Sequence, residues 1–112
     1  MSLTETTTPL AAGEHVVGRV DDVPVGEGRA FVAGGVPVAV FRLRDGSLHA
    51  TQAACPHAGG PLADGQVDEG VVVCPLHLNA FDLRTGESTT GQEPIAVHPC
   101  SVGDDGVVSV VL

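Results

Sequence analysis

Two short motifs in the middle of the chain bring together residue types that bind transition metals. Cys55-Pro56-His57 is followed, sixteen residues later, by Cys74-Pro75-Leu76-His77, a C-x-H-x16-C-x2-H pattern. A cysteine and a histidine one or two residues apart on a tight turn can present both side chains to one cofactor, and the proline after each cysteine stiffens the turn. Cys55, His57, Cys74 and His77 are therefore predicted to close a four-ligand cage.

For an iron–sulfur cluster in such a cage, charge counting explains why mixed ligands matter. Two ferric ions, two sulfides and two thiolates sum to zero when both imidazoles are neutral, and one added electron gives a charge of only −1. A [2Fe-2S] cluster held by four thiolates goes from −2 to −3 instead, so replacing two thiolates by imidazoles eases reduction. The four residues thus fit one [2Fe-2S] cluster that takes up a single electron.

Two other chemistries use the same residue types. A Cys2His2 zinc site needs no sulfide, but structural zinc loops usually separate their ligand pairs as C-x2-4-C and H-x3-5-H, which C-x-H beside C-x2-H fits poorly. A cysteine nucleophile served by a histidine is the second alternative. The third cysteine, Cys100, falls in a valine-rich stretch and is interpreted as a small buried apolar residue.

Longer stretches of sequence surround the two motifs. They are Cys55-Pro56-His57-Ala58-Gly59-Gly60-Pro61-Leu62, Cys74-Pro75-Leu76-His77 and Phe81-Asp82-Leu83-Arg84-Thr85-Gly86-Glu87. Together they closely resemble the Rieske ferredoxin family. The resemblance implies that Cys55 and Cys74 bind one iron and His57 and His77 the other, with the histidines at an exposed tip from which electrons leave. It also implies that Gly91-Gln92-Glu93-Pro94 is a third loop, which shields the cluster from water.

Differences from the high-potential members of that family predict a low reduction potential. Rieske proteins of respiratory and photosynthetic cytochrome bc complexes carry a second cysteine in each loop, joined as a disulfide, where this chain has Gly60 and Leu76. They also donate hydroxyl hydrogen bonds to the cluster from positions that hold Asn79 and Phe81 here, and losing such donors destabilises the reduced cluster. Leu78 replaces a common glycine, and it either alters the backbone or offers an apolar contact to a partner.

Short apolar or alternating runs must position these loops. Strands are predicted at 15–20, 29–33, 37–43, 48–53, 71–73 and 107–112, with turns at 34–35, 44–47 and 104–106 and no convincing helical periodicity. His15, His49 and His98 are interpreted as ordinary strand or surface residues, and Asp82 and Arg84 as fixing the turn after the second loop.

The chain is predicted to be one all-β domain over residues 1–112. With the resemblance, this becomes a Rieske-type antiparallel β sandwich with an inserted cluster-binding subdomain at about 52–87 and a flexible lead-in at 1–12.

The composition is strongly acidic. Fourteen Asp and Glu residues stand against five Arg and no Lys, giving a formal net charge of −9. Such a surface repels nucleic acid and anionic membranes, and a basic protein is the partner that it favours. The alternative interpretation is that the negative charge only keeps the protein soluble. Residues 1–14 carry no signal-peptide pattern and no run that could span a bilayer, so we expect a cytoplasmic protein without a membrane anchor.

The resemblance implies an electron carrier rather than an enzyme. One role is a ferredoxin between a flavoprotein reductase and a terminal oxygenase; the other is the small subunit of assimilatory NAD(P)H nitrite reductase, which shares both loop types and a similar length. An oxygenase catalytic subunit is excluded by length and by the missing two-His-one-carboxylate iron site. No nucleotide fingerprint or catalytic triad is visible. A structural zinc or interaction module is the alternative of another class, and a monomer is expected.

Overall fold

The chain is built almost entirely of short β-strands. The computed structural model describes residues 13–56, 59–76 and 78–112. Its strands are β2 (Glu14–Arg19), β3 (Glu27–Ala33), β4 (Val36–Arg42), β5 (Leu48–Gln52), β6 (Gln66–Asp68), β7 (Val71–Val73), β8 (Ala80–Asp82), β9 (Val97–His98), β10 (Cys100–Val102) and β11 (Val107–Val111). Two 3-10 turns, η1 (Val20–Asp22) and η2 (Leu62–Asp64), complete the described elements. None of the helices in this part of the chain is long and apolar enough to cross a membrane.

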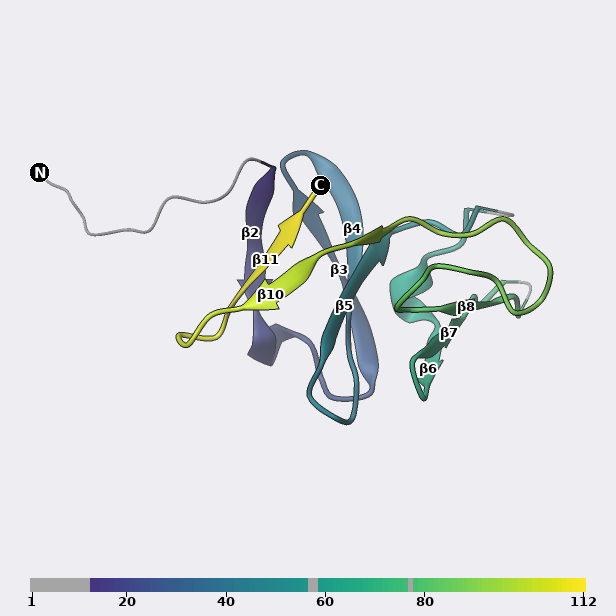
Figure 1. The fold of residues 1–112 in the computed structure, drawn as a ribbon, viewed down its shortest axis with the longest axis horizontal. Helices are drawn as coiled ribbons and strands as arrows, with labels where there is room; N and C mark the ends of the chain where they lie inside the picture. The colour runs from purple at the N-terminus through teal and green to yellow at the C-terminus, as the bar shows by residue number, and fades with distance from the viewer. Residues whose placement is uncertain (1–12, 57–58, 77) are drawn as a thin grey trace, which may run out of the picture.

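The strands form three sheets, with the orders β10-β11-β2, β3-β4-β5-β9 and β6-β7-β8. Every pairing of named strands in them is antiparallel. Figure 1 shows β2, β10 and β11 at one end of the molecule, β3 to β5 in the middle and the small sheet β6-β7-β8 at the other end. The predicted all-β, antiparallel fold is confirmed.

The central sheet is buried on both of its faces. Val40 and Ala50 pack with Val108 and Val110 of β11, which joins the first two sheets into a sandwich. Ala39 and Phe41, on the alternate positions of β4, belong to a second core. This core, here called the site core, comprises Ala39, Phe41, Leu43, Cys55, Leu62, Ala63, Val72, Cys74, Phe81, Leu83 and Ile95. A strand covered on both faces reads as a continuous apolar run, which is why β4 was readily predicted.

The predicted turns are confirmed where the chain reverses. Gly34 and Gly35 have φ values of 57° and 86°, as a two-residue hairpin between right-twisted strands requires. The predicted strand 29–33 begins earlier than expected, at Glu27, and so includes Gly28. A Cβ on Gly28 would lie 2.6 Å from the Phe41 ring, so this glycine is inside the strand because the aromatic ring packs directly over it.

Four short strands were not predicted: β6, β8, β9 and β10. Each has two or three residues, too few to show an alternating pattern, and each is defined by the strand it pairs with. The long segment between β8 and β9 runs around the end of the molecule that carries the small sheet (Figure 1). The chain between β5 and β9 therefore builds a separate layer over the outer face of the central sheet.

Candidate metal centre

The first cysteine loop is closed by two backbone hydrogen bonds. The N–H of Cys55 donates to the carbonyl of Gly60 at 2.8 Å, and the N–H of Gly59 donates to the carbonyl of Cys55 at 2.8 Å. Gly59 has a left-handed backbone with a φ of 71°, which turns the chain so that the carbonyl of Gly60 meets the N–H of Cys55. The loop holds Cys55 almost completely buried, with 2% of its surface exposed.

The second loop repeats this arrangement. The N–H of Cys74 donates to the carbonyl of Asn79 at 2.7 Å, and the N–H of Leu78 donates to the carbonyl of Cys74 at 3.0 Å. Leu78 therefore stands where Gly59 stands in the first loop, and its φ of 58° is also left-handed. Cys74 is fully buried. The two Cys-Pro motifs thus form a mirrored pair of loops with the same hydrogen-bond pattern.

The two loops lie against each other. An ideal Cβ on Gly60 would stand 3.2 Å from Cys74 Sγ and 2.8 Å from Leu76 Cγ. Cys55 and Cys74 both belong to the site core, and both are free cysteines. A Cβ at position 60 would therefore be in tight contact with the Cys74 thiol and with the Leu76 side chain, which shows how closely the two loops approach.

The described half of the ligand set fits an iron–sulfur cluster. Two buried, unbonded thiols on adjacent loops suit a cofactor that takes two thiolates. His57 and His77 lie outside the described residues. In the described ranges no group of three or more His, Cys, Asp or Glu side chains is arranged to hold a metal ion, because two of the four predicted ligands are not among them.

A third loop is tied to the second by side-chain hydrogen bonds. The hydroxyl of Thr90 donates to Asn79 Oδ1 at 2.9 Å and accepts from the backbone N–H of Ala80 at 3.3 Å. Because that hydroxyl has one proton, its 3.1 Å contact with Ser88 is a donation by Ser88. Ser88 Oγ in turn accepts from the N–H groups of Thr90 and Gln92, both at 3.1 Å.

This network was not predicted from the sequence. Its only signal was the Ser-Thr-Thr run that follows the Phe-Asp-Leu-x-Thr-Gly segment. The network runs in one direction, from Ser88 through Thr90 to Asn79. It fastens the third loop to the residue whose carbonyl closes the Cys74 loop.

The turn after β8 is held by Asp82, as predicted. Asp82 Oδ1 accepts from the backbone N–H of Arg84 at 2.7 Å and of Thr85 at 3.2 Å. Arg84 takes part through its backbone. Gly86 closes the turn with a φ of 82°, and a Cβ there would collide with the carbonyl oxygen of Ile95.

The remaining histidines lie in strands, as predicted. His15, His49 and His98 are in β2, β5 and β9. Burial lowers the pKa of His49, Arg84 lowers it further, and Asp45 and Asp82 act in the opposite direction. Cys100 is half-buried beside the Val40 and Val108 core, and burial raises the pKa of its thiol to about 11.

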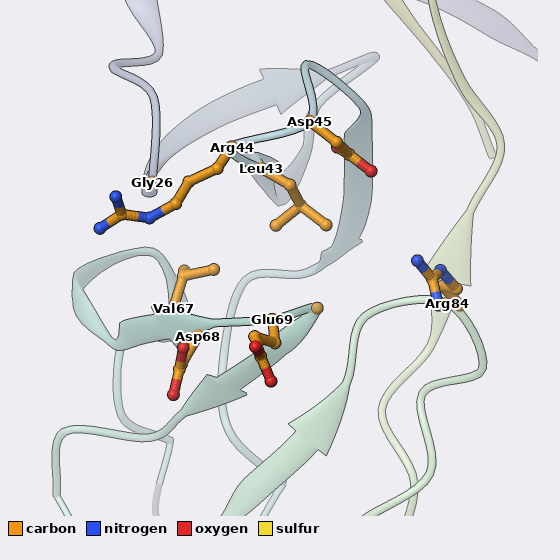
Figure 2. A pocket seen from close by; sticks show the side chains of 9 residues that line it. Gly26, Leu43, Arg44, Asp45, Val67, Asp68, Glu69 and Arg84 are labelled. Carbon is orange, nitrogen blue, oxygen red and sulfur yellow. The ribbon is translucent and has the colours of Figure 1, made fainter.

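A cleft of about 630 Å³ lies between the β4–β5 turn and the β6–β7 turn. Figure 2 shows the Arg44 side chain extending between Gly26 and Val67, with Arg84 on the far side of the cleft. The lining includes three carboxylates and two guanidinium groups but neither cysteine of the mirrored loops. This cleft is therefore separate from the candidate metal centre.

Comparison with known proteins assigns the family. Residues 13–99 match the family described as the Rieske [2Fe-2S] domain. The chain belongs to the Rieske [2Fe-2S] family. A Rieske domain holds one [2Fe-2S] cluster and carries electrons, so the predicted cofactor and the predicted electron-carrier role are confirmed.

Curated relatives of this Rieske protein include ferredoxin subunits of dioxygenases. It is 38% identical over 103 residues to the anthranilate 1,2-dioxygenase ferredoxin subunit of Burkholderia cepacia, covering 90% of this chain and 94% of that one. It is also 38% identical over 86 residues to the biphenyl dioxygenase ferredoxin subunit of Pseudomonas sp. (strain KKS102), covering 74% of this chain and 78% of that one.

Solved structures with the same Rieske fold include a nitrite reductase subunit and a dioxygenase ferredoxin complex. A putative NADH-dependent nitrite reductase small subunit from Mycobacterium tuberculosis superposes with a TM-score of 0.81 at 28% identity, covering 88% of this chain and 94% of that one. A chain from the complex of reduced oxygenase and oxidized ferredoxin in carbazole 1,9a-dioxygenase superposes with a TM-score of 0.77 at 31% identity, covering 88% and 93%.

Proposed function

We propose that this Rieske protein is a cytoplasmic, monomeric ferredoxin that passes single electrons from a flavoprotein reductase to a terminal oxygenase. The relatives named as dioxygenase ferredoxin subunits support the acceptor, since one of them is matched over 94% of its length. The chain has no site of its own for a substrate in this proposal. Its task is to hold one redox centre and to present that centre to two proteins in turn.

We assign the cluster to Cys55 and Cys74 on one iron and to His57 and His77 on the other, within a cluster-binding subdomain at about 52–87. The observation that carries this assignment is the mirrored pair of loops, in which each cysteine is buried behind two equivalent backbone hydrogen bonds. When bound, the cluster supplies reversible one-electron transfer. The loops bury both cysteine side chains away from water, and the Ser88–Thr90–Asn79 network fastens the second loop to the segment that follows β8.

A low reduction potential is part of the same proposal. Phe81 is fully buried and has no group that could donate a hydrogen bond. Asn79 has no hydroxyl, and its amide oxygen accepts from Thr90. Without two hydroxyl donors, the extra negative charge of the reduced state is less well stabilised. A redox titration that gave a clearly positive midpoint would overturn this part.

The small subunit of a nitrite reductase is the second candidate. It is favoured by the TM-score of 0.81 to the putative small subunit from Mycobacterium tuberculosis. The fold is common to both groups, however, while the higher sequence identity of 38% lies with the dioxygenase ferredoxins. The overall sequence identity therefore favours the oxygenase role.

The ligand assignment is tested with two histidine variants. The freshly purified protein should be red-brown, contain two irons and two acid-labile sulfides per chain, and give a rhombic EPR signal at low g on reduction. His77→Ala should abolish the visible spectrum and the EPR signal. The matched control, His98→Ala in β9, should leave both intact. Stoichiometric zinc without sulfide would contradict the ferredoxin assignment and support a structural zinc module.

The acceptor is tested by electron transfer. The protein is reduced with dithionite, desalted and mixed in a stopped-flow instrument with the oxidised oxygenase component of anthranilate 1,2-dioxygenase from Burkholderia cepacia. Rapid return of the oxidised ferredoxin spectrum is the expected result, because one electron leaves this chain and enters the oxygenase. Reoxidation by a sirohaem nitrite reductase but not by the oxygenase would favour the second candidate.

A further inference from the structure

Leu78 combines two unfavourable features in one residue. Its φ of 58° lies in the left-handed region, where the Cβ of an L-residue crowds the following carbonyl oxygen. Its side chain is also 72% exposed, the largest value among the exposed large apolar residues of the described chain. The other non-glycine residue described with a positive φ, Glu69, is polar and lies in a tight hairpin turn. An exposed leucine in such a conformation therefore calls for a reason other than folding.

The backbone around Leu78 does not require a leucine. Gly59 occupies the equivalent position of the mirrored loop and makes the equivalent hydrogen bond to its cysteine. The left-handed conformation of Leu78 is maintained by its own bond to Cys74 and by the neighbouring bond from Cys74 to Asn79. Strain that the surroundings maintain in this way is typical of functional positions.

The face formed by the two cysteine loops carries Leu78 and receives no acidic or basic side chain of the Asp, Glu, Lys or Arg type from either loop. Leu76 is 54% exposed and lies over Gly60, beside the Cys74 thiol. Residues 53–63 and 74–81 contain no Asp, Glu, Lys or Arg, although the chain as a whole has a net charge of −9. The central region of a protein interface is likewise depleted of charged residues. The sequence expectation of a basic partner therefore does not apply to this face.

We propose that Leu78, together with Leu76, is the apolar anchor by which the terminal oxygenase docks on this ferredoxin. The inference rests on the proposed function. Leu76 and Leu78 flank His77 in the sequence, and His77 is an assigned ligand through which electrons are expected to leave, so a protein that takes an electron there must cover these two exposed side chains. Leu78 projects from the second loop on a rigid backbone and inserts into an apolar depression of the oxygenase. The acidic surface outside this face affects the rate of encounter rather than the strength of the complex.

The test uses the cluster-loaded ferredoxin and the anthranilate 1,2-dioxygenase oxygenase component as the probe. The dissociation constant and the concentration dependence of the transfer rate are measured for wild type, Leu78→Gly and Leu78→Met. Leu78→Gly should raise the dissociation constant by about tenfold or more, because a buried leucine side chain is lost from the interface. Leu78→Met should stay within about threefold of wild type, since it keeps a similar apolar volume.

Two further measurements separate docking from folding. The visible and EPR spectra of Leu78→Gly should equal those of wild type, and its urea midpoint should be no lower, because glycine accepts the left-handed conformation. The control Val32→Ser removes a side chain that is 65% exposed on β3, away from the cysteine loops, and should leave binding unchanged. The dissociation constant should also vary little with salt, since the anchor carries no charge.

The outcomes distinguish this inference from the proposed function. If the oxygenase reoxidises wild type and Leu78→Gly with equal affinity, the anchor is wrong and the ferredoxin role stands. A steep weakening of the complex by salt, with Leu78→Gly unaffected, would place docking on the acidic surface instead. If the oxygenase does not reoxidise the wild-type protein, the proposed acceptor is wrong and the anchor has no oxygenase to bind.

Discussion

Leu76 lies against Gly60 of the opposite cysteine loop, such that a Cβ built on Gly60 would stand 2.8 Å from Leu76 Cγ. In a disulfide the Cβ of one cysteine lies about 3 Å from the sulfur of the other. A sulfur in the place of Leu76 Cγ would therefore be in bonding range of a cysteine at position 60. These are also the two positions at which the family resemblance implied the extra cysteines of high-potential members.

The double variant Gly60→Cys/Leu76→Cys is expected to form a disulfide between the two loops. Alkylation of the oxidised, unfolded protein followed by peptide mapping should find positions 60 and 76 linked and the three native cysteines alkylated. Gly60→Cys alone is the control and should show one additional free thiol. Free thiols at both positions in the oxidised double variant would mean that the loops are not arranged as described.

Gly86 and Gly91 form a matched pair of positions at which the loss of stability caused by adding a side chain can be compared. Both have left-handed backbones, with φ values of 82° and 87°, but only a Cβ at Gly86 would collide with the Ile95 carbonyl. Gly91→Ala should lower the free energy of unfolding by about 1–2 kcal/mol, from backbone strain alone. Gly86→Ala should lower it by about 3 kcal/mol or more, because the collision adds to the strain. Urea unfolding followed by circular dichroism measures both, and equal losses would contradict the close contact.

Local signals made much of the framework predictable. The apolar run of β4, the Gly34-Gly35 turn and the Asp-Gly turns all act within a few residues of sequence, so a strand and its reversal can be read directly. β6 could not be read in this way, because it has a single apolar residue, Val67, between two polar ones. Its strand conformation comes from pairing with β7, a contact that the sequence does not display.

The site was predictable to a similar degree. The spacing of Cys55 and Cys74 in their motifs was sufficient to predict two equivalent loops. The link from Thr90 to Asn79 was not predictable, because it depends on the third loop folding back across the second. For Leu78 the sequence left open a backbone change or a partner contact. The structure gives Leu78 the same left-handed backbone as Gly59 of the first loop and an exposed side chain, so the two loops show no difference in backbone here and the partner contact is the alternative to test.

Thr90→Val tests the network that fastens the third loop to the second. It removes the hydroxyl that bonds Asn79 and Ala80, and it leaves the Ser88 hydroxyl without its acceptor. Because water can reach these groups, the free energy of unfolding should fall by about 1 kcal/mol. The cluster should also bleach faster in air, as the Cys74 loop is held less firmly. Thr90→Ser keeps the hydroxyl and should behave as wild type in both measurements. Equal bleaching in all three proteins would show that the network does not support the loop.

Because the pKa of His49 is lowered in the folded chain, we expect a small loss of stability on mild acidification. Burial and the nearby Arg84 lower its pKa in the folded chain, and Figure 2 shows Arg84 at the same cleft as Asp45, which opposes the shift. The unfolded chain, with an ordinary histidine pKa near 6.5, therefore binds more protons as the pH falls through that value, so the folded state loses stability below it. Comparing urea unfolding of wild type and His49→Gln from pH 8 to 5.5 isolates this effect. Between pH 8 and 5.5 the free energy of unfolding of wild type should fall by at most about 0.5 kcal/mol more than that of the variant, since the ring is only half-buried. A relative gain on acidification would mean that Asp45 and Asp82 outweigh burial at this ring.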